Sequence, residues 1–422
     1  MTVPQGAALS IGAVLGTGVI ALPALAAQIA GPASLLAWAA LVVLSVPLAA
    51  TFAALGARYP DAGGVATYAR TAFGRRAAAV VGWSFYFAVP VGAPAAALFG
   101  GAYVAAALGG GTRTTLLTAA GLMLTVTIGN LGGVRVSGRL QLGLAALLVA
   151  LLLTATLTAW PHARAANLHP FAPHGWWAIG PAAAVLVWGF AGWEAVTSLA
   201  ADFRRPGRDL PRATAIALVV VAVLYLGIAA ASIAVLGPAM TAGSGGAPLA
   251  ELLAIGVGGK VRTIAAGAAV LLTLGTMNAY YAGAAKLGAA LGRDGALPAW
   301  FARGAAPGAV PRRSLLVVAL LGAVSLAVVA ATGTGTRALV LLTSGCFVLV
   351  YLMGSAAAVK LLPRSSAARR CALAALVASV GLMIVTGWYV LGTLVIAAGA
   401  LLYTRRSPSE EKSGRVVDSV AA

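Results

Sequence analysis

Twelve long apolar runs follow one another along this 422-residue chain, and they restrict its fold more than any other property of the sequence. A helix needs about 20 apolar residues to cross the hydrocarbon core of a bilayer. Only 9% of the residues are charged, whereas a soluble domain carries about 25%. We therefore predict an all-α integral membrane protein with twelve transmembrane helices in a lipid bilayer, which excludes soluble enzymes, secreted domains and nucleic-acid-binding modules. The predicted spans cover residues 6–30, 34–57, 77–108, 114–134, 140–160, 177–201, 211–237, 261–286, 314–333, 338–360, 371–387 and 389–404.

Two boundaries in this pattern are less regular. The last two spans are separated only by a weak break near Trp388. Residues 248–258 are apolar but too few to cross a bilayer, so they are expected to form a re-entrant or surface helix.

The basic residues predict how the chain is oriented. With the N-terminus placed inside, 23 of the 28 Lys and Arg residues fall in loops on that side and 5 on the other. Cytoplasmic loops carry such an excess of Lys and Arg, so both termini are predicted to be cytoplasmic. The net charge of +19 is thereby accounted for without a nucleic-acid partner.

Glycine pairs interrupt two of the spans, at residues 12–18 of span 1 and 188–194 of span 6. Gly costs a helix about 1 kcal/mol relative to Ala, so these are places where a helix can open. Opened backbone at membrane depth is tolerated only where it faces protein or a water-filled cavity.

The interruptions occupy corresponding places in two five-span units. Because five is odd, the second unit enters the membrane inverted relative to the first, and matching interruptions of this kind point to a transporter's binding site. The predicted divisions are 1–160 for the first repeat, 161–366 for the second, 367–404 for two further spans and 405–422 for a cytoplasmic tail.

Opened helices offer two kinds of charge complementarity. The N-terminus of a half-helix favours a carboxylate, and freed carbonyl groups accept hydrogen bonds from an ammonium group. A free amino acid carries both groups on one carbon, so it fits such a site. The alternative for span 1 is that Gly12 and Gly16 form a small-residue motif for close helix packing.

Glu194 is the only acidic residue within a predicted span. An ionised acid in the bilayer is expensive, so Glu194 should face the protein interior, where it either couples transport to protons or braces span 6 through hydrogen bonds. In span 8, Thr276 and Asn278 either line the cavity or bond between helices. A membrane enzyme would need further polar clusters at this depth, so we expect neither an enzyme nor a catalytic residue, cofactor or metal site.

Five motifs follow one another along the chain: GTGVI at 16–20, YPDAGG at 59–64, FAGWE at 190–194, RPGRDLPRA at 205–213 and RDGALP at 293–298. In this order they resemble the motifs of the amino acid–polyamine–organocation superfamily. Residues 62–66 and the separate segment 89–96 look like the bacterial branch that exports L-methionine and branched-chain amino acids.

This resemblance implies the leucine-transporter-like fold, a 5+5 inverted repeat with two further helices, in a bacterial cytoplasmic membrane. It implies that residues 16–18 contact the substrate's α-carboxylate, whereas residues 190–192 accept the α-amino group and shape the pocket. The complete predicted substrate-binding set is Val14, Gly16, Thr17, Gly18, Val19, Trp188, Phe190, Ala191 and Gly192.

The expected function is secondary active transport of neutral apolar amino acids (methionine, leucine, isoleucine and valine) by alternating access, in the export direction and coupled to protons through Glu194. Some superfamily members carry a Lys in span 5 where a sodium ion sits in relatives, but span 5 has no Lys here. Coupling to sodium would instead use carbonyls of span 1 with Thr273 or Thr276. An uptake permease or exchanger of the same fold, and a nontransporting amino-acid sensor, would also fit these residues. The sequence predicts no oligomeric state.

Overall fold

The computed structural model describes residues 2–59, 64–133, 138–194, 200, 203–237, 240, 247–259, 261–306 and 309–406, and within these the chain is helical without β-strands. The helices are α1 (Val3–Val14), α2 (Gly18–Ala30), η1 (Gly31–Ala33), α3 (Ser34–Arg58), α4 (Gly64–Phe73), α5 (Arg75–Leu108), α6 (Thr112–Leu131), α7 (Gly138–Ala159), η2 (Trp160–His162), η3 (Ala165–Leu168), η4 (Trp176–Ala178), α8 (Ile179–Leu186), η5 (Val187–Phe190), α10 (Pro206–Ala231), η7 (Ser232–Leu236), α12 (Pro248–Gly256), α13 (Val261–Arg293), η8 (Ala299–Ala302), α14 (Arg312–Thr332), α15 (Thr336–Leu361), α16 (Ala367–Val385), η9 (Gly387–Tyr389) and α17 (Val390–Arg406).

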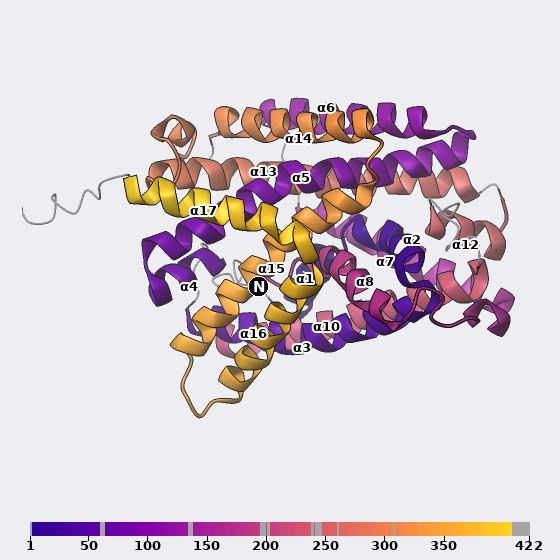
Figure 1. Cartoon of the computed structure of the whole chain (residues 1–422), viewed down its shortest axis with the longest axis horizontal. Coiled ribbons are helices and arrows are strands. Elements are labelled where there is room, and N and C mark those ends of the chain that lie inside the picture. Colours follow the sequence, from indigo (N-terminus) through magenta and orange to yellow (C-terminus); the bar gives the residue numbers. More distant parts are fainter. Residues whose placement is uncertain are drawn as a thin grey trace, which may run out of the picture.

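Most of the long helices run along the longest axis of the molecule (Figure 1). The long helix α5 packs against α6, α13, α14 and α15; α6, α13 and α14 lie with it along one side of the bundle, while α15 runs obliquely across the middle. On the other side, α10 packs against α1 and α3, while α2 and α8 lie together near the middle. The interrupted helices therefore lie between two groups of continuous ones.

Ten helices within the described residues are long and apolar enough to cross a membrane, so the predicted count of twelve is not reproduced. The difference arises at the two interrupted spans. Span 1 is divided between α1 and α2, and the chain then continues through η1 into α3 as a helical stretch from Gly18 to Arg58. Span 6 is predicted over residues 177–201, of which 195–199 and 201 lie outside the described residues; its described part contains the short apolar helix Trp176–Phe190.

Other predicted boundaries agree with the structure. The weak break near Trp388 is the short helix η9, where Gly387 has a φ of 66° between α16 and α17. Residues 248–258 contain the nine-residue helix α12, which packs against α7 and α13.

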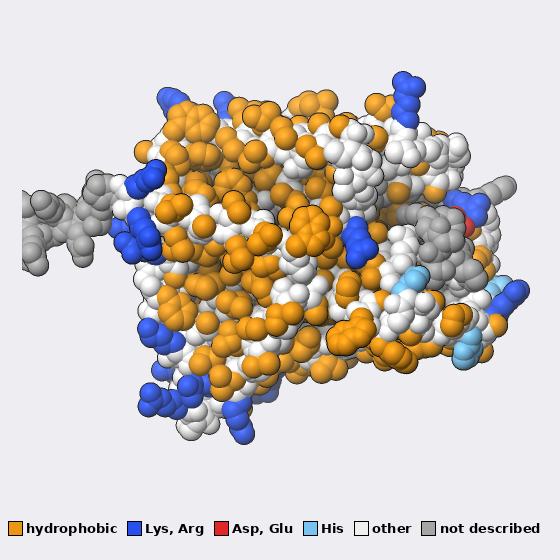
Figure 2. All heavy atoms as spheres, in the orientation of Figure 1, with side chains coloured by type: hydrophobic (Ala, Val, Ile, Leu, Met, Phe, Trp, Pro, Cys, Tyr) orange, Lys and Arg blue, Asp and Glu red, His pale blue; other side chains and the backbone are white. Residues whose placement is uncertain are grey.

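The face of the molecule shown in Figure 2 is apolar over much of its length. Ile384 of α16 and Val395 of α17 expose 72% and 71% of their surface, which would be costly in water but is favourable in lipid. Small residues allow close contacts inside, as expected when helix association depends on packing. A side chain on Gly288 would collide with Tyr86 and Ser314 of neighbouring helices.

Candidate functional site

The predicted interruption of span 1 is present. Helix α1 ends at Val14 and α2 begins at Gly18, and Leu15 between them has a non-helical ψ of 76°. The N-cap residue of α2, Thr17, makes no side-chain capping hydrogen bond. The first backbone N–H groups of a helix have no partner within it, so the start of α2 is equipped to bind an anion.

The predicted interruption of span 6 is also present. Helix α8 ends at Leu186, a 3₁₀ turn follows to Phe190, and Ala191 is extended with a ψ of 137°. Gly192 then adopts a φ of 132°, a conformation that residues with a Cβ rarely take.

The two interruptions lie against one another through glycine. A Cβ on Gly192 would lie 2.7 Å from the carbonyl oxygen of Ala13, and one on Gly18 would lie 3.2 Å from the Cα of Gly189. No ordinary side chain fits at the first of these contacts without a shift of the backbone. The glycines of the sequence motifs therefore bring two opened stretches of main chain together.

A small cavity lies at this junction. Its walls are mostly small or apolar: α5 contributes five residues from Ala88 to Ala96, while Met277 and Phe347 come from α13 and α15. Among the described residues that line it, none carries a charged side chain. The members of the predicted substrate-binding set that line it are Val14, Gly16, Thr17, Gly18, Trp188 and Ala191.

Three predicted residues lie beside this cavity without lining it. Val19 is fully buried. The Phe190 ring packs on Trp38 and Tyr225, with centroid distances of 5.9 and 4.9 Å, and so points away from the cavity. Gly192 lines a second cavity instead.

Two tyrosines that the sequence interpretation missed bind the opened main chain. The Tyr225 hydroxyl of α10 donates to the carbonyl oxygens of Val14 at 3.0 Å and Gly189 at 2.6 Å, sharing one proton between the two interruptions. The Tyr351 hydroxyl of α15 lies 3.3 Å from the Phe190 carbonyl oxygen, to which it also donates. In the sequence, each of these tyrosines stands alone in an apolar run. A buried hydroxyl requires a hydrogen-bond partner, so this pattern could have indicated that both bind other parts of the chain.

Glu194 belongs to the framework of the site and to a second cavity. Its Oε2 accepts hydrogen bonds from the Gly192 N–H at 3.0 Å and the Tyr351 hydroxyl at 2.8 Å. These contacts fit one of the two roles expected for Glu194, that of bracing span 6 through hydrogen bonds. Glu194 also lines a cavity of about 850 Å³ between α1, α7 and α13, as do Gly16 and Thr276.

The polar residues of span 8 separate into two groups. Thr276 lines both cavities. Asn278 accepts a hydrogen bond from Asn130 of α6 at 2.8 Å, so the structure places it between helices and outside the residues that line the cavity. The Thr273 hydroxyl faces α5, where a Cβ on Gly100 would lie 2.8 Å from it.

An all-helical membrane protein whose two helix interruptions meet at a central cavity has the architecture of a secondary transporter. Comparison with known proteins agrees with this class. The family described as "Amino acid permease" matches residues 2–413. The chain therefore belongs to the amino acid permease family, within the amino acid–polyamine–organocation superfamily, and is a multi-pass membrane protein.

Individual relatives align over almost the whole chain. YecA of Bacillus subtilis (strain 168), named as an uncharacterized amino acid permease, is 34% identical over 97% of this chain and 96% of its own. The L-methionine/branched-chain amino acid exporter YjeH of Escherichia coli (strain K12) is 33% identical over 96% of both chains. The branched-chain amino acid permease BcaP of Bacillus subtilis is 25% identical over 69% of this chain and 66% of its own.

Proposed function

We propose that this protein is a secondary active transporter of neutral apolar amino acids, with methionine, leucine, isoleucine and valine as the substrate class. The observation that carries the proposal is the apolar cavity where α1, α2 and the end of η5 meet.

Backbone groups would bind the charged end of the substrate. Because the described residues lining the cavity contribute no charged side chain, main-chain dipoles must stabilise the zwitterion. The start of α2, at residues 16–18, would bind the carboxylate, since a helix N-terminus carries partial positive charge. Carbonyl groups of the opened stretch around residues 190–192 would accept from the ammonium group, because a carbonyl already bonded to tyrosine retains a second lone pair.

The remaining cavity wall would select the side chain. Residues of α5, Met277 and Phe347 offer apolar contacts, whereas a substrate with a charged side chain would be buried without a partner. Two relatives that are named for branched-chain amino acids, YjeH and BcaP, support the same substrate class.

Transport would proceed by alternating access within a 5+5 inverted repeat followed by two further helices, twelve spans in all. The divisions proposed for the chain are those predicted from the sequence, with both termini in the cytoplasm. Export is the direction that we propose, in line with the name of YjeH.

We further propose that protons drive the movement and that Glu194 couples them. In its ionised form Glu194 accepts hydrogen bonds from Gly192 and Tyr351, and it borders the second cavity, from which a proton could reach it. Protonation removes the negative charge that holds the opened stretch of span 6 to α15, and so would release that stretch.

Counterflow of radiolabelled leucine in proteoliposomes tests the transport proposal. Liposomes loaded with unlabelled leucine or methionine should accumulate external labelled leucine, while liposomes loaded with lysine should not. Binding without counterflow would identify a sensor instead, and equal counterflow with lysine would refute the apolar selectivity.

The coupling proposal has a separate test. Glu194→Gln should retain leucine counterflow but lose the response of net transport to an imposed pH gradient. A full response in this variant would exclude Glu194 as the coupling residue. Acceleration by a sodium gradient without a pH gradient would favour sodium coupling, which relies on Thr276 and carbonyls of span 1.

A further inference from the structure

Five arginines converge on a hollow at one end of the helix bundle, which shares no lining residue with the central cavity. They come from four helices: Arg70 from α4, Arg75 and Arg76 from α5, Arg293 from α13 and Arg405 from α17. The hollow has a volume of about 1600 Å³ and is open to solvent. We call it the arginine hollow.

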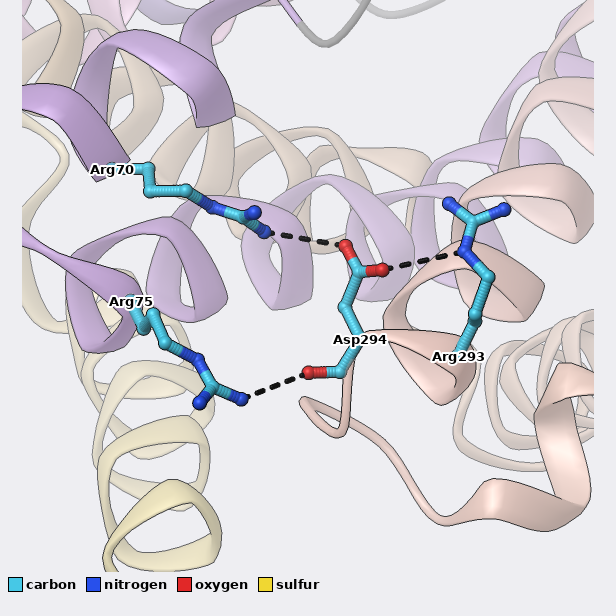
Figure 3. A network of polar contacts seen from close by, with 4 residues as sticks. All are labelled: Arg70, Arg75, Arg293 and Asp294. Carbon is cyan, nitrogen blue, oxygen red and sulfur yellow. Dashed lines mark hydrogen bonds and ion pairs between the residues drawn. The ribbon is translucent and has the colours of Figure 1, made fainter. Parts of the chain in front are cut away.

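Among the described residues that line the hollow, one carries a carboxylate, Asp294 (Figure 3). It accepts from Arg70 at 3.2 Å and from Arg293 at 3.4 Å, and Arg75 donates to the main-chain carbonyl of the same residue at 3.2 Å. Its charge therefore offsets one of five, leaving the lining of the hollow with a net charge of +4.

Spare hydrogen-bond donors remain in the hollow. A guanidinium group has five N–H donors, and each contact to Asp294 uses one of those on its arginine. The structure places no ion pair or hydrogen bond on the side chains of Arg76 and Arg405 among the described residues. The general excess of Lys and Arg in cytoplasmic loops explains why arginines are frequent at this end of the bundle. It does not explain why five of them surround one concave space.

The hollow lies at the C-terminal end of helix α17, one of the helices apolar enough to cross a membrane. Thr404 and Arg405, in the last turn of α17, form one wall, and the same helix exposes Val395 and Leu402 along its length. Trp83 links the segment that carries Asp294 and Ala296 to α17: its Nε1 donates to the Ala296 carbonyl at 2.7 Å, and its ring packs on Tyr403 of α17. An apolar surface thus continues directly into a preformed basic site.

We propose that the arginine hollow binds the phosphate headgroup of an anionic phospholipid from the leaflet at this end of the molecule. Arginine binds phosphate through two parallel hydrogen bonds, and basic pockets between transmembrane helices suit anionic lipid headgroups. A soluble phosphate would satisfy the arginines equally well, but it would make no use of the apolar face of α17. Acyl chains lying along that face favour the lipid. This inference is independent of the substrate that the central cavity carries.

The test compares lipid binding by two double variants of the full-length purified protein. Arg76→Gln/Arg405→Gln removes two positive charges from the hollow without disturbing the contacts to Asp294. Arg364→Gln/Arg370→Gln removes two exposed charges that line no part of the hollow and serves as the matched control. Native mass spectrometry measures retention during titration with phosphatidylglycerol or phosphatidylcholine, and thermal unfolding in phosphatidylcholine verifies that each variant folds.

The affinities of the wild type and the control for phosphatidylglycerol should agree within about two-fold. The affinity of the Arg76→Gln/Arg405→Gln variant should be about 30-fold lower, since each Arg near an anionic surface contributes about 1 kcal/mol. Phosphatidylcholine should bind none of them well, and millimolar inorganic phosphate should not displace the lipid. Equal binding by the hollow variant and the wild type would overturn the proposal, as would equal retention of phosphatidylcholine. Displacement by inorganic phosphate would assign the hollow to a soluble anion. If the double variant does not fold, Arg405→Gln alone, at an exposed helix end, provides the same comparison.

Discussion

The close approach of the two interruptions at Gly192 leads to a quantitative prediction for Gly192→Ala. The new Cβ would lie 2.7 Å from the Ala13 carbonyl oxygen and 3.0 Å from the Val14 Cα, at a φ of 132°. The backbone conformation costs about 1–3 kcal/mol for a residue with a Cβ, and the added methyl group costs about 1–3 kcal/mol of overpacking. We expect the sum, roughly 2–6 kcal/mol, to lower thermal stability and to abolish leucine counterflow, because the main chain of α1 must move away from that of span 6.

The matched control for this prediction is Gly283→Ala in α13. A Cβ at Gly283 meets no atom within 4 Å, so the same chemical change should be neutral or stabilise the helix by up to about 1 kcal/mol. Thermal unfolding in detergent, followed by intrinsic fluorescence, and counterflow in proteoliposomes measure both variants. If Gly192→Ala unfolds at the same temperature as Gly283→Ala and still transports leucine, then the two opened stretches do not touch as described.

Further predictions concern the polar contacts of the site. Tyr225→Phe leaves one carbonyl group of each interruption without its hydrogen-bond donor. It should reduce stability by about 1–3 kcal/mol and weaken leucine binding, as measured by the leucine-dependent thermal shift. An unchanged shift would show that the contact is dispensable. Tyr351→Phe removes the hydroxyl that donates to Glu194 at 2.8 Å. It should lower the unfolding temperature and weaken the response of transport to a pH gradient. A variant with an unchanged unfolding temperature and an unchanged pH response would contradict the role of this pair. Asn278→Ala removes the interhelical acceptor of Asn130, which keeps its bond to the Val126 carbonyl, and should reduce stability by about 0.6–1.7 kcal/mol. The KM of the folded protein for leucine should stay the same, and a raised KM would place Asn278 in the substrate site.

The membrane class and the positions of most helices could be predicted from the sequence. Apolar runs of spanning length need no tertiary information, because the bilayer itself requires that the backbone form a helix there. The interruptions of spans 1 and 6 were also predictable, since glycine pairs weaken a helix wherever it lies. The described helices do not by themselves give the number of spans: the stretch from Gly18 to Arg58 joins two predicted spans in one run of helix, and the described part of span 6, Trp176–Phe190, is shorter than a spanning helix.

The amino-acid order alone thus specifies local properties: where the chain crosses lipid, where its helices weaken and which residue types are available there. Which of these residues meet depends on how distant helices pack. Thr276 and Asn278 are two residues apart on α13, yet one faces the cavity and the other faces α6. Tyr225 reaches a carbonyl oxygen 211 positions away in the chain. Helical periodicity states which side chains share a face, but the arrangement of the bundle determines what that face contacts.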